Sequence, residues 1–120
     1  MTNTQLEKVR QWWEAWGWQQ LPDAALPPTR RMVNDCAAGF LYTTNSSIAW
    51  IEWITVDPKS DKLIRRKSLD ELIKLLEQDA KGQGAEQIFI ASLHPGLSAR
   101  LDSHGYTRGD FMQHFVKDIS

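Results

Sequence analysis

The chain has 120 residues and a formal net charge of −1, and 42% of its residues are hydrophobic and 24% charged. These values are typical of a soluble globular protein, so residues 1–120 are expected to form a single domain around one core. The composition excludes a disordered chain, and no apolar run approaches the roughly 18 residues of a membrane-spanning helix. The near-neutral charge argues against broad binding to nucleic acid, and the lack of a secretory leader predicts a cytoplasmic location.

The cysteine and histidine residues form no recognisable metal-binding pattern. Cys36 is the only cysteine, which excludes an internal disulfide and a zinc site built on cysteines. We interpret it as a small core residue rather than a nucleophile. His94, His104 and His114 lack the i, i+4 spacing of a helical metal pair, so no metal is expected.

The first predicted element is an amphipathic helix at 4–18, within a tryptophan-rich segment at 1–20. Its apolar residues recur at spacings of three and four, and Gly17 marks its end. Trp12 and Trp18 lie off the apolar stripe, so we expect these two side chains to contact a ligand or partner. The stripe itself, which is expected to pack onto a sheet, consists of Leu6, Val9, Trp13 and Trp16.

A proline-rich connector at 21–29 follows, and it is expected to be extended because proline restricts both itself and the residue before it. Strands are predicted at 30–34 and 37–43. Turn-forming residues at 44–47 join the second strand to 48–56 in an antiparallel hairpin. Both faces of this last strand are mainly apolar, which is typical of a central strand covered on both sides.

Glu52 is the one charged residue in the strand at 48–56. A carboxylate in a dry site is penalised by several kcal/mol unless it has a partner or borders a water-filled cleft. Two interpretations remain open. Glu52 is either a functional carboxylate at a cleft or the ion-pair partner of Arg30 or Arg31 on a neighbouring strand.

Basic residues gather after this strand, ahead of a predicted helix. Ser68 opens a Ser-x-x-Glu capping box, so the helix is expected to start near Ser68 and to end at Gly82 and Gly84. The unpaired N–H groups and positive dipole of a helix start favour an anion, which predicts a phosphate or pyrophosphate site. The alternative is a solvated basic turn. The basic side chains are Lys62, Arg65, Arg66 and Lys67.

The remaining segments complete a mixed sheet. We predict a strand at 86–92, a short helix at 95–104 that stops at Gly105, and a final strand at 111–117. Because a hairpin precedes a strand-helix-strand crossover, the predicted fold class is α/β (α+β), with a mixed, mainly antiparallel central sheet and helices on both faces.

The order of these elements and several short motifs resemble the GNAT superfamily of acyl-coenzyme A N-acyltransferases. In that family a central strand leads into an Arg/Gln-x-x-Gly-x-Gly/Ala loop, whose amides hold the pyrophosphate of coenzyme A. The strand resembles IAWIEWITVDP here, and the later elements resemble QIFIAS, LSARLDSH and Gly105-Tyr106. The likeness covers about residues 30–117. It is similar in particular to short GNAT-like proteins of bacteriophages and prophages, which implies the cytosol of a bacterial host.

The resemblance implies acetyl-coenzyme A or coenzyme A as cofactor and acyl transfer to an amine of a small molecule or protein. It implies Glu52 as the base and Tyr106 as the acid. Ser68 and Asp70 stand where the family has glycines, which favours an alternative: a catalytically inactive GNAT-like module that binds a partner. Exposed edge strands also make a homodimer possible. The implied cofactor contacts are Ile54, Val56, Lys62, Arg65, Arg66, Lys67 and Ser68.

Overall fold

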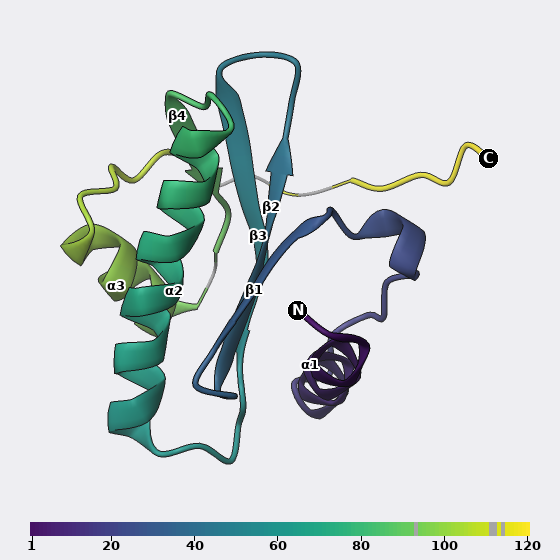
Figure 1. The fold of residues 1–120 in the computed structure, drawn as a ribbon, viewed down its shortest axis with the longest axis vertical. Coiled ribbons are helices and arrows are strands. Elements are labelled where there is room, and N and C mark those ends of the chain that lie inside the picture. Colours follow the sequence, from purple (N-terminus) through teal and green to yellow (C-terminus); the bar gives the residue numbers. More distant parts are fainter. Residues whose placement is uncertain (93, 111–112, 114) are drawn as a thin grey trace.

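The computed structural model describes residues 1–92, 94–110, 113 and 115–120. Its elements are α1 (Asn3–Ala15), the 3-10 helix η1 (Asp23–Ala25), β1 (Thr29–Val33), β2 (Ala37–Thr43), β3 (Ile48–Val56), α2 (Lys62–Gly82), β4 (Gln87–Ile90) and α3 (Pro95–Ser103). Within the described residues, the strands form one four-stranded sheet in the order β1-β2-β3-β4. Helix α1 lies on one face, and α2 and α3 lie on the other (Figure 1). Only the β3–β4 pair is parallel among these strands, so the predicted mixed, mainly antiparallel sheet is confirmed.

Helix α1 confirms the predicted amphipathic helix but not its predicted buried stripe. Thr2 and Gln5 form a capping box at its start, with the Gln5 amide donating to the Thr2 hydroxyl at 3.1 Å. The helix ends at Ala15, so Trp16 does not continue the buried face of the helix and is 40% exposed. Trp12, by contrast, is only 4% exposed. The expectation that Trp16 is buried and Trp12 lies outside the core is therefore wrong.

The connector between α1 and β1 is less extended than predicted. Its middle forms the single turn of η1, in which the Leu26 amide donates to the Asp23 carbonyl at 3.1 Å. Leu26 is buried in the cluster beneath α1. Arg10 of α1 holds the connector in place, because its guanidinium donates to the Leu21 carbonyl and to the Asp23 carboxylate.

Tight turns join the antiparallel strands. The β1–β2 turn places Asn34 and Asp35 at φ values of 53° and 48°, a left-handed conformation that Asn and Asp adopt more readily than other residues with a side chain. In the β2–β3 turn, the Thr44 hydroxyl accepts from the Ser46 amide at 3.0 Å and donates to the Ile48 carbonyl at 2.7 Å. The predicted hairpin is confirmed.

A β-bulge interrupts this hairpin in the middle of β3. Phe40 of β2 pairs with Glu52 of β3. The next pair is Ala38 with Thr55, so β3 has one residue more than β2 in this interval. Within it, Trp53 adopts a φ of 58°. Even-numbered residues of β3 face α1 before the bulge and α2 after it, so the two halves of the strand present different residues to each helix.

Helix α2 begins at Lys62, well ahead of the predicted start near Ser68. Asp61 is its N-cap, and the Asp61 carboxylate accepts from the amides of Leu63 at 2.9 Å and Ile64 at 3.4 Å. A carboxylate at this position satisfies free amides and complements the helix dipole. The earlier cap therefore sets the boundary, and Ser68 lies fully buried inside the helix.

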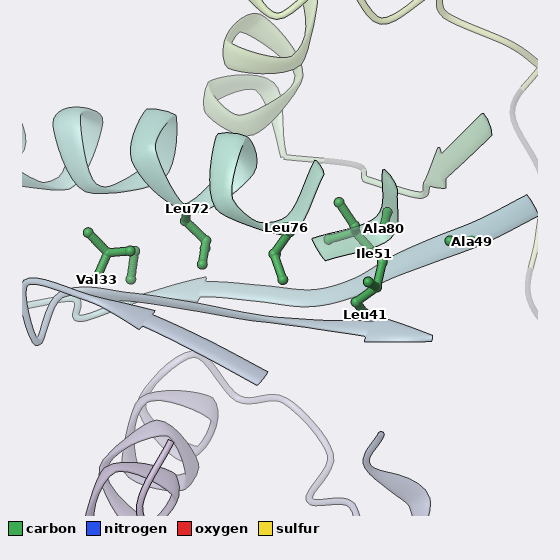
Figure 2. Close-up of a cluster of buried hydrophobic side chains, with 8 residues drawn as sticks. Val33, Leu41, Ala49, Ile51, Leu72, Leu76 and Ala80 are labelled. Atoms are coloured by element: carbon green, nitrogen blue, oxygen red, sulfur yellow. The ribbon is translucent and has the colours of Figure 1, made fainter. Parts of the chain in front are cut away.

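One side of α2 packs an apolar stripe onto the sheet (Figure 2). Gly39 of β2 permits the close approach, since a Cβ at this position would lie 3.0 Å from Cδ1 of Leu76. Dense burial of aliphatic groups is the main favourable contribution to folding. The buried members of this aliphatic cluster are Val33, Ala37, Leu41, Ala49, Ile51, Leu72, Leu76 and Ala80.

The elements after α2 match their predicted order. Strand β4 is shorter than the predicted 86–92, and α3 begins at Pro95, where Nδ1 of His94 accepts a backbone N–H at 3.1 Å. Gly105 follows α3 at a φ of 86°. Across the described ranges, none of the helices is both long and apolar enough to cross a membrane.

The last predicted strand, 111–117, falls partly outside the described residues. Positions 111, 112 and 114 belong to that undescribed part, and residues 113 and 115–117 are not in a strand. The described end of the chain carries three strongly exposed apolar side chains, Phe115, Val116 and Ile119.

Candidate functional site

Strands β3 and β4 pair only along the first part of β3. Parallel pairing joins Ile48–Ile51 to Gln87–Ile90 and stops there, whereas β3 continues to Val56. The bulge at Trp53 lies just beyond the last paired residue, and bulges usually increase the local twist of a strand. Among the residues that the structure describes, the segment Glu52–Val56 therefore has β2 on one side and no strand on the other. Such an open backbone edge can pair with an extended ligand.

Helix α2 starts close to the end of this open edge and carries basic side chains on its first turns. Lys62, Arg66 and Lys67 are exposed, and Arg65 is half-buried. The Nε of Arg65 is buried and finds no acceptor in the described part of the chain. An unpaired buried donor costs about 1–3 kcal/mol, so an anion at this position would be stabilising.

The start of α2 also carries a negative charge. The Asp61 carboxylate accepts from the first amides of the helix, which are the donors that would otherwise hold a phosphate oxygen. The run Arg65–Asp70, which the resemblance aligned with a pyrophosphate loop, is helical throughout, because the helix is capped at Asp61. An anion at this helix start would meet side-chain cations more readily than backbone amides.

Three predicted cofactor contacts lie in the protein interior or near it. Ser68 is 0% exposed, and its hydroxyl accepts from Nδ2 of Asn34 at 3.1 Å. The side chains of Ile54 and Val56 pack against the aliphatic cluster, and the Val56 carbonyl accepts from Nε1 of Trp16 at 2.9 Å. A ligand along β3 would therefore contact Ile54 through its backbone and would not reach Ser68, while the Val56 carbonyl is already held by Trp16.

Glu52 lies on the face of the sheet that α1 covers. It pairs with Phe40, which belongs to the cluster beneath α1, and residues directly opposite one another share a face. Arg30 shares this face because it pairs with Phe40 from the other side. Arg31 lies on the opposite face, where its guanidinium holds Asp79 of α2 at 2.6 and 2.7 Å. Of the two arginines, Arg30 is the one on the same face as Glu52.

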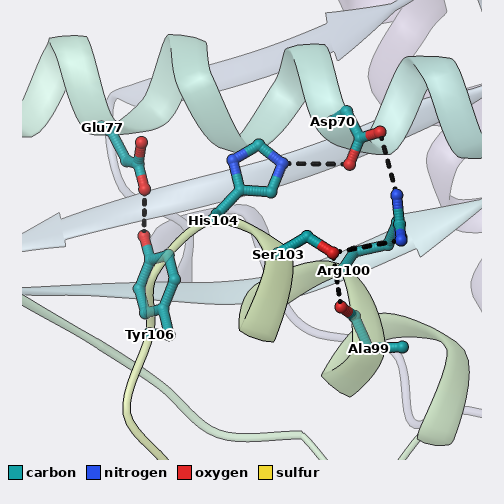
Figure 3. Close-up of polar contacts among 7 residues, drawn as sticks. All are labelled: Asp70, Glu77, Ala99, Arg100, Ser103, His104 and Tyr106. Atoms are coloured by element: carbon teal, nitrogen blue, oxygen red, sulfur yellow. Dashed lines mark hydrogen bonds and ion pairs between the residues drawn. The ribbon is translucent and has the colours of Figure 1, made fainter.

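Tyr106 lies on the other side of the sheet, next to α2. Its hydroxyl donates to the Glu77 carboxylate at 2.7 Å (Figure 3). Burial, followed by the hydrogen bond to Glu77 and its negative charge, raises the pKa of Tyr106 above its ordinary value. A phenol held in this way is a poor proton donor. The structure thus separates Tyr106 from Glu52 and does not bring the two together around one substrate.

Polar contacts between α2 and α3 were missed by the sequence analysis. Asp70 of α2 contacts Nε2 of His104 at 3.0 Å and a guanidinium nitrogen of Arg100 at 3.3 Å (Figure 3). Burial raises the pKa of Asp70, but the hydrogen bond from His104 and the charge of Arg100 lower it by more, so it lies below its usual value. The partners are 30 and 34 residues apart in sequence, and no local pattern links them.

Comparison with known proteins gives a fold but no family. No protein-family model and no curated protein matches the sequence. A solved structure described as a probable acetyltransferase matches with a TM-score of 0.65 and 16% identity, over 100% of this chain and 95% of that one. The chain has the fold of that protein. A second solved structure, "Putative acetyltransferase from Agrobacterium tumefaciens str. C58", matches with a TM-score of 0.64 and 12% identity, over 98% of this chain and 96% of that one.

Proposed function

We propose that the protein is an N-acyltransferase that uses an acyl-coenzyme A, with acetyl-coenzyme A as the simplest donor. The observation that carries the proposal is the end of β3–β4 pairing at Ile51 and Ile90, which leaves the extended segment Glu52–Val56 with an open edge. An amide-containing arm can pair along such an edge while its phosphates meet the cations of α2. The fold shared with two solved structures, one described as a probable and one as a putative acetyltransferase, supports the same conclusion.

The residues around the start of α2 fit coenzyme A in one respect and oppose it in another. The unpaired Nε of Arg65 and the exposed side chains of Lys62 and Arg66 supply donors for phosphate oxygens. The Asp61 carboxylate occupies two amides and repels an anion. When bound, coenzyme A supplies the acyl group in the activated form of a thioester. Since the cations outnumber the carboxylate, we expect Asp61 to weaken binding without abolishing it.

Glu52 is the proton acceptor in this proposal. It is half-buried on β3, just beyond the last residue that pairs with β4. A carboxylate at this position can take a proton from an ammonium group, which frees the nitrogen lone pair for acyl transfer. We assign Tyr106 no role in proton transfer, because its hydroxyl is held by Glu77 beside α2.

A thermal-shift titration with coenzyme A tests the proposal. The melting temperature should rise, because a ligand that binds the native state stabilises it by about 2.7 kcal/mol at 100 times its Kd. Replacing the exposed side chains Lys62 and Arg66 together by alanine should reduce this rise. Asp61→Ser is the matched variant: serine keeps the helix cap and removes the charge, so the rise should increase. If neither wild type nor Asp61→Ser responds to millimolar coenzyme A, the proposal is wrong.

A second function, a non-catalytic binding module, is favoured by the carboxylate at the start of α2. Under this alternative the first turn is a protein contact, in which Leu63 is 65% and Ile64 48% exposed beside Lys62. The same titration separates the two functions. A response to coenzyme A in Asp61→Ser alone would mean that Asp61 blocks the cofactor in the natural chain, and it would support the binding module.

A further inference from the structure

An aromatic row crosses the α1 side of the sheet. Tyr42 of β2 pairs with Trp50 of β3, which pairs in turn with Phe89 of β4. Residues in register on neighbouring strands share a face, so the three rings stand side by side. The ring centroids of Trp50 and Phe89 are 5.0 Å apart, with an interplanar angle of 53°. These two rings form a surface that we call the aromatic shelf.

Helix α1 does not cover the aromatic shelf. The buried residues of α1 pack on Ala38 and Phe40 of β2, and Tyr42 is at the margin of this cluster. Beyond it, Trp50 is 36% and Phe89 43% exposed. Paired aromatic rings that stay open to solvent offer an apolar group of a ligand a large contact area.

Glu52 places a negative charge beside the shelf. It lies two residues along β3 from Trp50 on the same face, which corresponds to a separation of roughly 7 Å. Burial raises the pKa of Tyr42 and a hydrogen bond from Trp53 lowers it, while the charges of Glu52 and Arg30 have smaller, opposite effects. The influence of Glu52 on this hydroxyl agrees with its place beside the middle of the aromatic row, next to Trp50 along β3.

We propose that the acceptor substrate is a primary amine joined by a short linker to an aromatic or similarly flat apolar group. The flat group lies on Trp50 and Phe89, and the ammonium group points toward Glu52. Aromatic ring faces attract cations, and the carboxylate adds a direct electrostatic attraction. This inference rests on the proposed function, because it names the substrate class for the carboxylate that serves there as proton acceptor.

Binding of phenethylamine in the absence of coenzyme A tests the inference. The indole N–H signals of a 15N-labelled sample report on each tryptophan, and we expect the Trp50 signal to shift at millimolar ligand. Two matched probes each remove one feature. 3-Phenylpropionate keeps the ring but reverses the charge, and n-butylamine keeps the amine but lacks the ring. Each should bind about tenfold more weakly than phenethylamine. Equal binding of all three probes would overturn the inference.

Single substitutions locate the site. Trp50→Leu and Phe89→Leu should each weaken phenethylamine binding about tenfold. In these variants the backbone amide signal of Glu52 reports on binding. Glu52→Gln should remove the preference for phenethylamine over 3-phenylpropionate. Trp18→Leu is the matched control, because Trp18 is 38% exposed but lies next to α1, beside Arg10 and Glu14. An equal loss in Trp18→Leu and in the shelf variants would contradict the assignment.

The phenethylamine experiment contains no coenzyme A, so its outcome can be distinguished from that of the thermal-shift titration that tests the proposed function. A shift of Trp50 with phenethylamine, together with no thermal response to coenzyme A, supports an amine site and overturns the acyltransferase. A response to coenzyme A without a shift of Trp50 overturns the amine class and leaves the acyltransferase standing.

Discussion

The two faces of the sheet are built from different kinds of side chain. On the α2 face, aliphatic residues such as Ile51, Leu72 and Leu76 are fully buried against one another (Figure 2). On the α1 face the packing is aromatic, and the ring centroids of Trp13 and Phe40 are 5.9 Å apart. Aliphatic groups need no hydrogen-bond partners, whereas indole rings bring polar atoms into the interior.

Polar atoms on the α1 face are incompletely satisfied. Nε1 of Trp13 and Oγ1 of Thr55 are buried without a hydrogen-bond partner in the described residues, and each such group costs about 1–3 kcal/mol. The same face carries the charge of Glu52, next to the left-handed Trp53. Strain and unsatisfied groups of this kind gather at functional sites. The α2 face is therefore an aliphatic packing surface, whereas the α1 face also carries a charge, unsatisfied polar atoms and a left-handed residue.

Leu76→Ala tests the stabilising role of the α2 face and has the largest expected effect. Leu76 is 0% exposed, so lost contacts and a residual cavity should lower the free energy of unfolding by about 3 kcal/mol. Urea denaturation measures the change. Leu63→Ala is the control on the same helix, because Leu63 is 65% exposed, and it should change stability by less than about 0.5 kcal/mol. Similar small losses in both variants would contradict the proposed division between the faces.

A pair of substitutions at Trp53 tests the strain on the α1 side. Both Trp53→Ala and Trp53→Gly remove the ring, but at a φ of 58° alanine meets a steric penalty that glycine avoids. We expect the glycine variant to be more stable by about 1 kcal/mol, which reverses the usual order in a strand. Urea denaturation of the two variants gives the difference. A more stable alanine variant would show that Trp53 is not strained.

Asp70→Asn tests whether the outer side of α2 depends on charge rather than on apolar packing. The folded-state pKa of Asp70 lies below its usual value of about 3.9. Its contribution is therefore complete above that usual value and is lost as the pH falls through the lower, folded value. We expect Asp70→Asn to lose roughly 0.5–1 kcal/mol near pH 7.

Denaturation of wild type and Asp70→Asn across pH 2–7 measures this dependence. The gap in stability between the two proteins should narrow below about pH 4. A gap that stays constant over the whole range would mean that the loss comes from packing and not from the charge of Asp70.

Trp16→Phe has the smallest expected effect and probes the contact between α1 and the end of β3. It keeps a ring but removes the indole N–H that donates to the Val56 carbonyl at 2.9 Å. Because Trp16 is 40% exposed, water can replace the lost donor, and the loss should be about 0.5 kcal/mol. Trp18→Phe is the control at a similar exposure of 38%. An equal effect in both variants would assign the loss to the ring and not to the hydrogen bond.

The sequence predicted the segments whose pattern is local. The hairpin of β2 and β3 followed from two β-prone runs around a turn, and α1 followed from its helical periodicity. The predicted start of α2 was wrong because Asp61 and Ser68 are both good capping residues, and nothing between them breaks a helix. The bulge at Trp53 could not be predicted, since register belongs to a pair of strands and not to one.

The candidate site was predictable only in part. Glu52 stood out because it is the single charge in an apolar strand, and the structure places it where β3 leaves β4. The surroundings of Asp70 and Tyr106 depend on how α3 docks against α2, which no spacing in the sequence reveals. The aromatic shelf also required the parallel register that brings Trp50 next to Phe89.

The two halves of strand β3 differ in their neighbouring strands, and hydrogen exchange of the backbone amides should reveal the difference. Ile48–Ile51 lies between two strands, whereas Glu52–Val56 is flanked by β2 alone within the described chain. Amides enclosed on both sides exchange for deuterium only when strands separate, while those at an open edge exchange through small local openings. In the second half, the amides that point away from β2 should therefore exchange rapidly, whereas those that point toward β2 stay protected. Any molecule that lies along the second half will slow its exchange, which reveals occupancy without knowledge of the ligand.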